Sequence, residues 1–368
     1  MAYGTVNADL MTTSDGVSSS GLYGFKNRII NGNMMVWQRG TTFNAPADGD
    51  YNADRWQYGA NQSGKVNIAQ SSSAPSGFSY SALVTSTSSY SIGASDLFRY
   101  TQRIEGFNTA DLAFGTASAS TVTLSFWVMS SLTGTFGGSL QNNNGDRSYP
   151  FTYTINSANT WEYETITIAG DTTGTWVGAT NGNGLQLNFS LGAGSSRIGT
   201  AGAWAAAGYY GATGQTNLVA TNAATWQIVG VQLEKGSTAT SFDYRPYGTE
   251  LQLCMRYYEK TYEIGTVPGT ATSLGVATSG GGSTGSTTSF IGGNGQRFTV
   301  PKRTAPTVTV YDPAGNSGVC QRWQLGVSNV NNQNWVTDTP SATAFSGYSG
   351  SGSNTSGVNY HYTASAEL

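Results

Sequence analysis

The chain has 368 residues and a formal net charge of −3, and only 10% of its residues are charged, against about 25% in an average globular protein. No basic cluster is larger than Lys302-Arg303, which argues against a nucleic-acid partner, and no run of residues approaches the ~18 apolar residues of a membrane span. Its 49 glycines and 21 tyrosines favour short strands joined by tight turns, so the composition predicts an all-β protein.

Residues 1–26 alternate small and polar side chains and contain four glycines. They include too few large apolar residues to form a core, so we expect an extended arm. Two interpretations stay open for it: a disordered leader, or an attachment segment that orders only when it docks on a partner.

Residues 27–247 carry recurrent strand signals. From residue 122 to residue 129, large apolar side chains alternate with Thr123, Ser125, Trp127 and Met129, so one set faces a core and the other faces outward. Further strands are predicted at residues 54–58, 98–104, 151–155, 165–169, 185–191 and 226–233. Many short antiparallel strands around one core predict a jelly-roll-like β-sandwich.

A short helix is predicted at residues 249–258, with Thr249 as its N-cap, inside a helical linker at residues 248–258. Residues 259–368 are predicted to form a smaller C-terminal β domain with strands near residues 297–300 and 307–311. Cys254 and Cys320 lie far apart and match no metal-binding spacing, so we expect two free thiols, no bound metal and no cofactor.

Five segments, read in order, resemble one family: NRIINGNMMVWQRG (27–40), YNADRW (51–56), QRIEG (102–106), TVTLSFWVMSS (121–131) and TWQIVGVQLEKGSTATSFDYRPYGTELQLCMRYYEK (225–260). The series is similar to the carbohydrate-binding-module-like β-sandwich found in tail-fibre and other virion structural proteins of tailed phages, marine ones especially. This resemblance implies a homotrimeric tail fibre or fibre-like appendage that is assembled in the host cytoplasm and resides in the virion. It also implies that residues 1–26 bind other virion proteins and that the sandwich contacts a host surface glycan or receptor.

Two alternatives to a tail fibre stay open. One is a capsid-decorating or head-fibre protein, and the other is a tailspike that depolymerises a polysaccharide. Hydrolysis by paired carboxylates needs two acids about 5–9.5 Å apart, and Glu105, Asp111, Glu162 and Glu164 are the nominees. The one histidine, His361, has no nucleophile motif beside it and is expected at the surface. We therefore predict no catalytic residue and a protein that is not an enzyme.

A glycan site needs an aromatic platform beside amide or hydroxyl groups. Trp127 is the predicted platform, with Gln186 and Asn188 on the same outer sheet face. The alternative interpretation is that a loop or a neighbouring chain covers Trp127, because tryptophan is highly buried on average.

A second candidate glycan site is the small-residue-rich loop at residues 201–214, which carries Trp204, Tyr209 and Tyr210. The tryptophans within or beside apolar alternation are instead expected in the core; these are Trp37, Trp56, Trp161 and Trp226.

Overall fold

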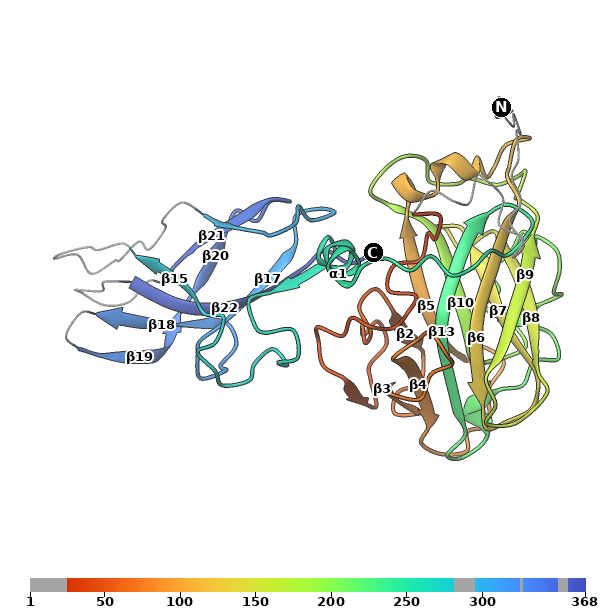
Figure 1. The fold of residues 1–368 in the computed structure, drawn as a ribbon, viewed down its shortest axis with the longest axis horizontal. Coiled ribbons are helices and arrows are strands. Elements are labelled where there is room, and N and C mark those ends of the chain that lie inside the picture. Colours follow the sequence, from red (N-terminus) through yellow and green to blue (C-terminus); the bar gives the residue numbers. More distant parts are fainter. Residues whose placement is uncertain (1–24, 281–294, 325–326, 350–356) are drawn as a thin grey trace, which may run out of the picture. The chain divides into compact units, whose positions relative to one another are not determined.

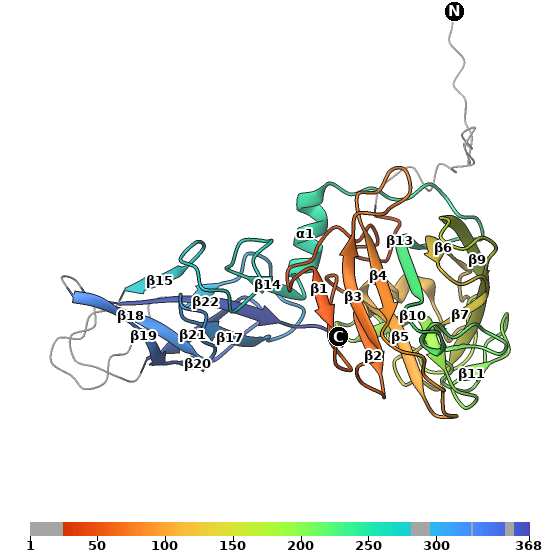
Figure 2. The same ribbon diagram turned by 90° about the horizontal axis from the view of Figure 1, so that it is seen from below.

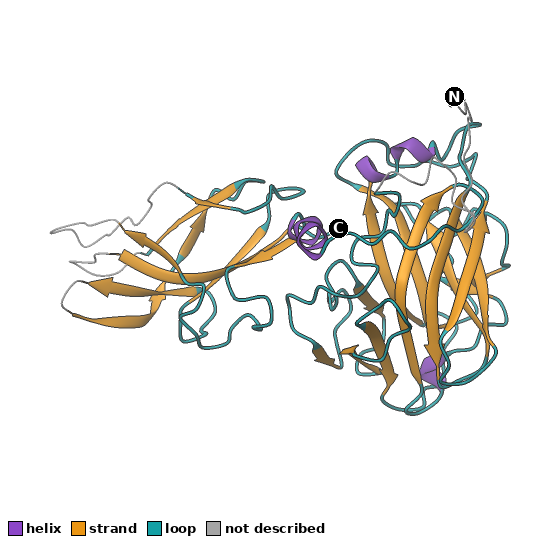
Figure 3. Ribbon diagram, in the orientation of Figure 1, coloured by secondary structure: helices purple, strands orange, loops and turns teal. Residues whose placement is uncertain are grey.

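The computed structural model describes residues 25–280, 295–324, 327–349 and 357–368. The predicted arm at residues 1–26 lies almost wholly outside the described residues. Strands dominate the described chain and its helices are short (Figure 3), so the prediction of an all-β protein is confirmed. The chain forms two compact units.

The first unit consists of the described residues up to Met35, Asn44–Asp50 and Gln57–Pro246, and it is a sandwich of two sheets (Figure 1). One sheet contains β3-β4-β13-β6-β9 in this order, with strands at Val66–Ser71, Ser81–Ser86, Thr225–Lys235, Val122–Ser130 and Glu162–Ile168. Of the short strand β1 (Thr42–Asn44), only Asn44 belongs to this unit. The other has the order β2-β5-β10-β7-β8, with strands at Gln57–Ala60, Leu97–Glu105, Asn183–Ala193, Gly134–Gln141 and Ser148–Ile155. Shorter elements are η2 (Gly106–Asn108), η3 (Ala110–Leu112), β11 (Ile198–Gly199), β12 (Gly211–Ala212) and η4 (Leu218–Ala220).

A layer of aromatic rings fills the space between these two sheets. The ring centroid of Phe126 on β6 lies 5.0 Å from that of Phe189 on β10 and 5.1 Å from that of Tyr153 on β8. The indole N–H of Trp226 on β13 donates to the Tyr153 hydroxyl over 3.0 Å. Because each sheet contributes to the layer, these rings are the core of the unit, and the prediction of a core Trp226 is confirmed.

The second unit consists of Val36–Phe43, Tyr51–Trp56 and Tyr247–Leu368. Its long strand β22 (Gly357–Ser365) pairs with four others (Figure 2), namely β14 (Tyr258–Lys260), β15 (Ala277–Gly280), β17 (Thr307–Tyr311) and β18 (Val319–Gln324), and β19 (Val327–Asn334) pairs with β18. A smaller sheet has the order β16-β21-β20, at Gln296–Arg297, Ala344–Tyr348 and Val336–Asp338. Val358, Tyr360, Tyr362 and Ala364 alternate along β22 and form the buried core with residues such as Phe345.

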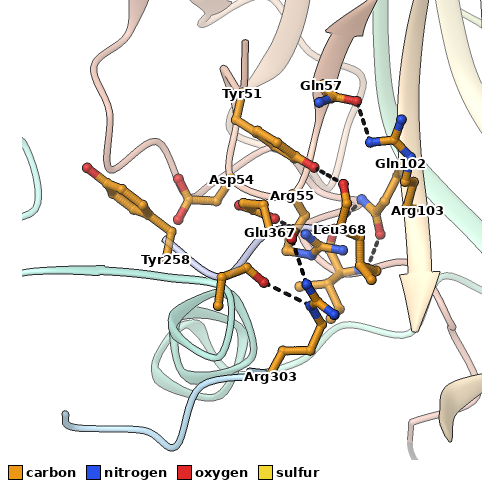
Figure 4. Close-up of polar contacts among 12 residues, drawn as sticks. Tyr51, Asp54, Arg55, Gln57, Gln102, Arg103, Tyr258, Arg303, Glu367 and Leu368 are labelled. Atoms are coloured by element: carbon orange, nitrogen blue, oxygen red, sulfur yellow. Dashed lines mark hydrogen bonds and ion pairs between the residues drawn. The ribbon is translucent and has the colours of Figure 1, made fainter. Parts of the chain in front are cut away.

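Charged and aromatic side chains hold the segments Val36–Phe43 and Tyr51–Trp56 against the rest of the second unit (Figure 4). The Glu367 carboxylate accepts a hydrogen bond from Arg39 over 3.0 Å and pairs with buried Arg55. The guanidinium of Arg39 lies 3.6 Å from the ring centroid of Tyr258, and that of Arg55 lies 3.5 Å from that of Tyr257. These contacts join residues more than 200 positions apart, and those with Glu367 more than 300, which is why the sequence pattern did not group them.

The structure therefore divides the chain differently from the predicted boundaries. Residues 36–43 and 51–56, predicted to lie in the sandwich, belong to the second unit. The helix α1 (Tyr247–Met255) also belongs to the second unit, and it begins two residues before Thr249, the predicted N-cap. Cys254 and Cys320 are buried free thiols.

Candidate functional site

A cleft of about 650 Å³ lies on the first unit, on the face of the β13-β6-β9 sheet that points away from the core. We call it the aromatic cleft. Its floor is formed by residues of β6, β9 and β13, and its walls by residues 76–78 and 238–244. Every residue named for it belongs to the first unit.

Strand alternation places two rings side by side on the floor. Phe126 and Val128 point into the core, so Ser125 and Trp127 on the same strand point outward. Trp127 is directly opposite Tyr163 of β9, and their ring centroids are 5.2 Å apart at an interplanar angle of 47°. Tyr163 is 45% exposed and Trp127 is partly exposed, so the pair offers an accessible aromatic surface.

A glycine opens the middle of the floor. The pairing of β13 with β6 shifts between Val229 and Gln232, which marks a β-bulge, and Gly230 lies in the bulge with φ +66°. A Cβ atom added at Gly230 would lie 2.7 Å from Cζ of Phe78 and 3.2 Å from Cδ1 of Trp127. Both the backbone conformation and the depth of the cleft therefore depend on a residue without a side chain.

Two buried polar side chains of β13 hold one wall in place. Glu234 accepts hydrogen bonds from the backbone N–H of Thr240 (2.8 Å), the Thr240 hydroxyl (2.6 Å) and the Gln232 amide (2.9 Å). Gln232 also donates to the carbonyls of Thr240 and Ser241 over 3.3 Å each and accepts from the backbone N–H of Asp243 over 2.8 Å. Segment 238–244 is thus fixed along the outer face of the strand.

Three further rings complete the apolar part of the wall. Phe78, Phe242 and Tyr244 contact one another with ring centroids 4.9 to 5.5 Å apart. Tyr244 is 57% exposed, and partial burial raises the pKa of its phenol, so the ring is neutral at physiological pH. Hydroxyl groups also line the cleft: that of Thr165 is exposed, whereas Ser125 is buried.

The chemistry of the cleft is apolar and neutral. Among the described residues that line it, the ionisable side chains are two tyrosines, and none is a carboxylate, an amine or an imidazole. Aromatic faces bind the C–H faces of a ligand, and hydroxyls bind its polar edge. The cleft therefore suits a neutral ligand with both apolar faces and hydroxyl groups.

The structure separates the predicted site residues. Trp127 lies in the aromatic cleft, but the prediction that Gln186 and Asn188 share its face is wrong, because β10 belongs to the opposite sheet. Both amides are buried: Gln186 donates to Asn188 over 2.7 Å, and Asn188 donates to the Ser139 hydroxyl over 3.2 Å. The loop that follows β10 covers this face, as the bond from Gln141 to the Tyr209 carbonyl (2.6 Å) shows.

The aromatic residues of the loop at 201–214 are partly exposed and lie outside the aromatic cleft. The indole of Trp204 donates to the Ala169 carbonyl over 2.7 Å, and its ring centroid lies 5.4 Å from that of Trp176. The guanidinium of Arg99 lies 4.6 Å from the ring centroid of Tyr210, and Tyr209 packs against the backbone of Gly199. These side chains are occupied by contacts within the chain.

Several site residues were missed from the sequence. Tyr163 and Thr165 alternate with Glu164 and Ile166 along β9, and this period of two was a usable signal for an outward face. Gly230 interrupts the apolar run of β13, which is a known sign of a bulge. No local pattern indicated Phe78, because its place in the cleft depends on tertiary packing.

The prediction of a surface His361 is wrong. The imidazole is fully buried and stacks on Tyr262 with ring centroids 3.9 Å apart. Its Nε2–H faces the Thr272 carbonyl at 3.1 Å, and the Thr261 hydroxyl faces its Nδ1 at 3.1 Å. Burial lowers the pKa of His361, so the neutral ring serves to join a loop to β22.

The four nominated carboxylates lie outside the aromatic cleft. Glu105 is buried at the end of β5, and Asp111 pairs with Arg28 over 2.8 Å. Glu162 accepts hydrogen bonds from the backbone N–H groups of Asn156 and Ser157, while burial and Glu162 together raise the pKa of Glu164.

Trp161 is partly exposed, whereas Trp37 and Trp56 are buried as predicted.

Within the described ranges, no three His, Cys, Asp or Glu side chains gather as metal ligands would. The helices in the same ranges are too short or too polar to cross a bilayer.

No model of a known protein family matches the chain, and no curated protein sequence matches it. Among solved structures, the enzymatically active domain of tailspike protein 4 from bacteriophage CBA120 is similar with a TM-score of 0.29 and 13% identity over 53% of this chain and 22% of that chain. The family 11 carbohydrate-binding module of Clostridium thermocellum, in complex with a mixed-linked tetrasaccharide, has a TM-score of 0.27 and 10% identity over 56% of this chain and 99% of that one. TmCBM61 in complex with β-1,4-galactotriose has a TM-score of 0.29 and 10% identity over 58% and 100%.

Proposed function

We propose that the protein is a virion structural protein of a tailed phage, a tail fibre or fibre-like appendage, that attaches to a host surface by binding a neutral glycan in the aromatic cleft. The observation that carries this proposal is the exposed pair of Trp127 and Tyr163 on the cleft floor, 5.2 Å apart. A sugar ring presents C–H faces that pack on aromatic rings and hydroxyls that pair with exposed hydroxyls of the cleft such as that of Thr165.

The five segments that resemble phage tail-fibre sandwiches support assignment to a virion. The longest of them, residues 225–260, supplies β13 with its bulge at Gly230 and the wall at residues 238–244. A homotrimer, with residues 1–26 bound to other virion proteins, is part of the same proposal. Cryo-electron microscopy of virions tests this proposal. Threefold density at the tail is the expected result, whereas density on the capsid would favour the capsid-decorating or head-fibre alternative.

The glycan would be bound and not hydrolysed. Glycosidases place two carboxylates about 5–9.5 Å apart around the scissile bond, and the described residues of the cleft supply none. Incubation of the purified protein with host polysaccharide is expected to release no reducing sugar. Release of reducing sugar would instead favour the tailspike alternative.

Trp127→Ala tests the cleft directly. An interface tryptophan that packs against ligand contributes about 2 kcal/mol or more, so affinity for a host glycan on an array of neutral and acidic saccharides is expected to fall roughly 30-fold. Trp161→Ala is the matched control, because Trp161 is also partly exposed but lies outside the cleft. Unchanged affinity in Trp127→Ala would refute the proposed site.

A further inference from the structure

A second cleft, of about 590 Å³, lies on the second unit and differs in chemistry from the aromatic cleft. Its floor is a row of side chains from four neighbouring strands: Thr278 on β15, Asn359 on β22, Gln321 on β18, and Asn329 and Asn331 on β19. Asn359 is directly opposite both Thr278 and Gln321 in the sheet register. We call this row the amide row.

The row points away from the core of the unit. Val358 and Tyr360, the neighbours of Asn359 on β22, are buried in that core, as is Cys320 beside Gln321. Strand alternation therefore directs Asn359 and Gln321 to the opposite face.

Hydrogen bonds connect the amide row from one end to the other. The Thr278 hydroxyl donates to Asn359 Oδ1 over 2.9 Å, and Asn359 Nδ2 donates to Gln321 Oε1 over 2.9 Å. Gln321 Nε2 donates to Asn331 Oδ1 over 2.7 Å, and Asn329 Nδ2 donates to Gln321 Oε1 over 3.2 Å. The chain of bonds fixes the orientation of each amide and polarises its neighbours.

Each amide keeps capacity for a ligand. An amide nitrogen has two hydrogens and an amide oxygen has two lone pairs, so Asn359 and Asn331 use only part of what they offer. The Thr278 oxygen donates within the row and keeps lone pairs that can accept. The floor therefore offers donors and acceptors at fixed positions without any net charge.

The wall beside the row is also fixed before a ligand binds. Thr272 borders the cleft, and its backbone N–H donates to the Pro313 carbonyl over 2.9 Å while its own carbonyl faces buried His361 at 3.1 Å. Pro313 also lines the cleft, and His361 lies on β22, which contributes Asn359 to the floor. A site whose groups are already ordered loses less entropy when a ligand binds.

We propose that the amide row is a second binding site, specific for a neutral saccharide of one or two sugar units. A sugar hydroxyl both donates and accepts, which matches a row in which donors and acceptors alternate, and charged ligands find no counter-ion among the described lining residues. Val276 and Pro313 add a small apolar edge for C–H groups. The volume lies within the range of about 300–1,000 Å³ typical of small-ligand sites.

The test uses the full chain with Trp127→Ala, which under the proposed function weakens binding in the aromatic cleft roughly 30-fold, so that the signal from the amide row predominates. Saturation-transfer NMR with a panel of neutral, sulfated and carboxylated mono- and disaccharides is expected to show binding of at least one neutral member. Adding Gln321→Ala or Asn331→Ala is expected to weaken that affinity about three- to tenfold, the effect of one or two lost hydrogen bonds. Asn334 lies on β19 with Asn331 but outside the cleft, so Asn334→Ala is expected to leave the saccharide affinity unchanged.

Four outcomes would overturn the proposal. They are no saccharide signal in the Trp127→Ala protein, a signal only from sulfated or carboxylated saccharides, equal loss in Asn334→Ala, and a change in oligomeric state of Asn331→Ala without any change in saccharide binding. The last outcome would identify the strand edge as a contact between chains. Since Gln321 and Asn331 are substituted separately and circular dichroism monitors folding, the failure of one variant to fold leaves the other as the test.

Discussion

Substitution of Glu234 by alanine should release one wall of the aromatic cleft while leaving the sandwich folded. The carboxylate is 4% exposed and accepts three hydrogen bonds, two of them from Thr240 at 2.8 and 2.6 Å. A hydrogen bond to a charged group contributes about 1.5–3 kcal/mol, and the bonds from Gln232 to the Thr240 and Ser241 carbonyls remain in the variant. We therefore estimate that local opening of segment 238–244 becomes easier by about 3 kcal/mol.

Hydrogen exchange measures that opening directly. A decrease of about 3 kcal/mol in the opening free energy corresponds to roughly 100-fold faster exchange of the Thr240 amide. Amides of β6 should exchange as in the wild type, because the core beneath the cleft is untouched. Glu263→Ala is the control, since Glu263 is exposed and its removal changes the net charge equally. Unchanged exchange at Thr240, or equal acceleration throughout β6, would refute this account of the wall.

Three further predictions concern other residues. Gly230→Ala should lower stability by about 1–2 kcal/mol through its left-handed backbone and weaken glycan binding, and full affinity in a titration would contradict the described depth of the cleft. Lys302→Met should cost about 3–5 kcal/mol in denaturant unfolding because Glu259, 2.6 Å away and buried, loses its counter-ion, whereas adding Glu259→Gln should recover part of this loss. Burial raises the pKa of Asp54 to about 6, so the folded state holds its proton more tightly than the unfolded state and stability should fall by roughly 3 kcal/mol from about pH 4 to pH 6; an equal decline in Asp54→Asn would assign that slope to other groups.

The sequence by itself determined the all-β class and most strands of the sandwich. Alternation of period two along residues 122–129 placed Phe126 in the core and Trp127 outside, because adjacent side chains of a strand point to opposite faces. This rule is local, so it needs no knowledge of the partner strand. It therefore placed two residues of the aromatic cleft, Ser125 and Trp127, on the correct face.

Only the tertiary structure decided which outward faces are shared and which are covered. Alternation cannot show that β6 and β10 lie in opposite sheets, or that a later loop buries Asn188. It also cannot show that Arg55 pairs with Glu367, 312 positions away, and thereby holds Tyr51–Trp56 against the rest of the second unit. Such contacts depend on strand order and on long-range packing, which a periodic pattern within one segment does not encode.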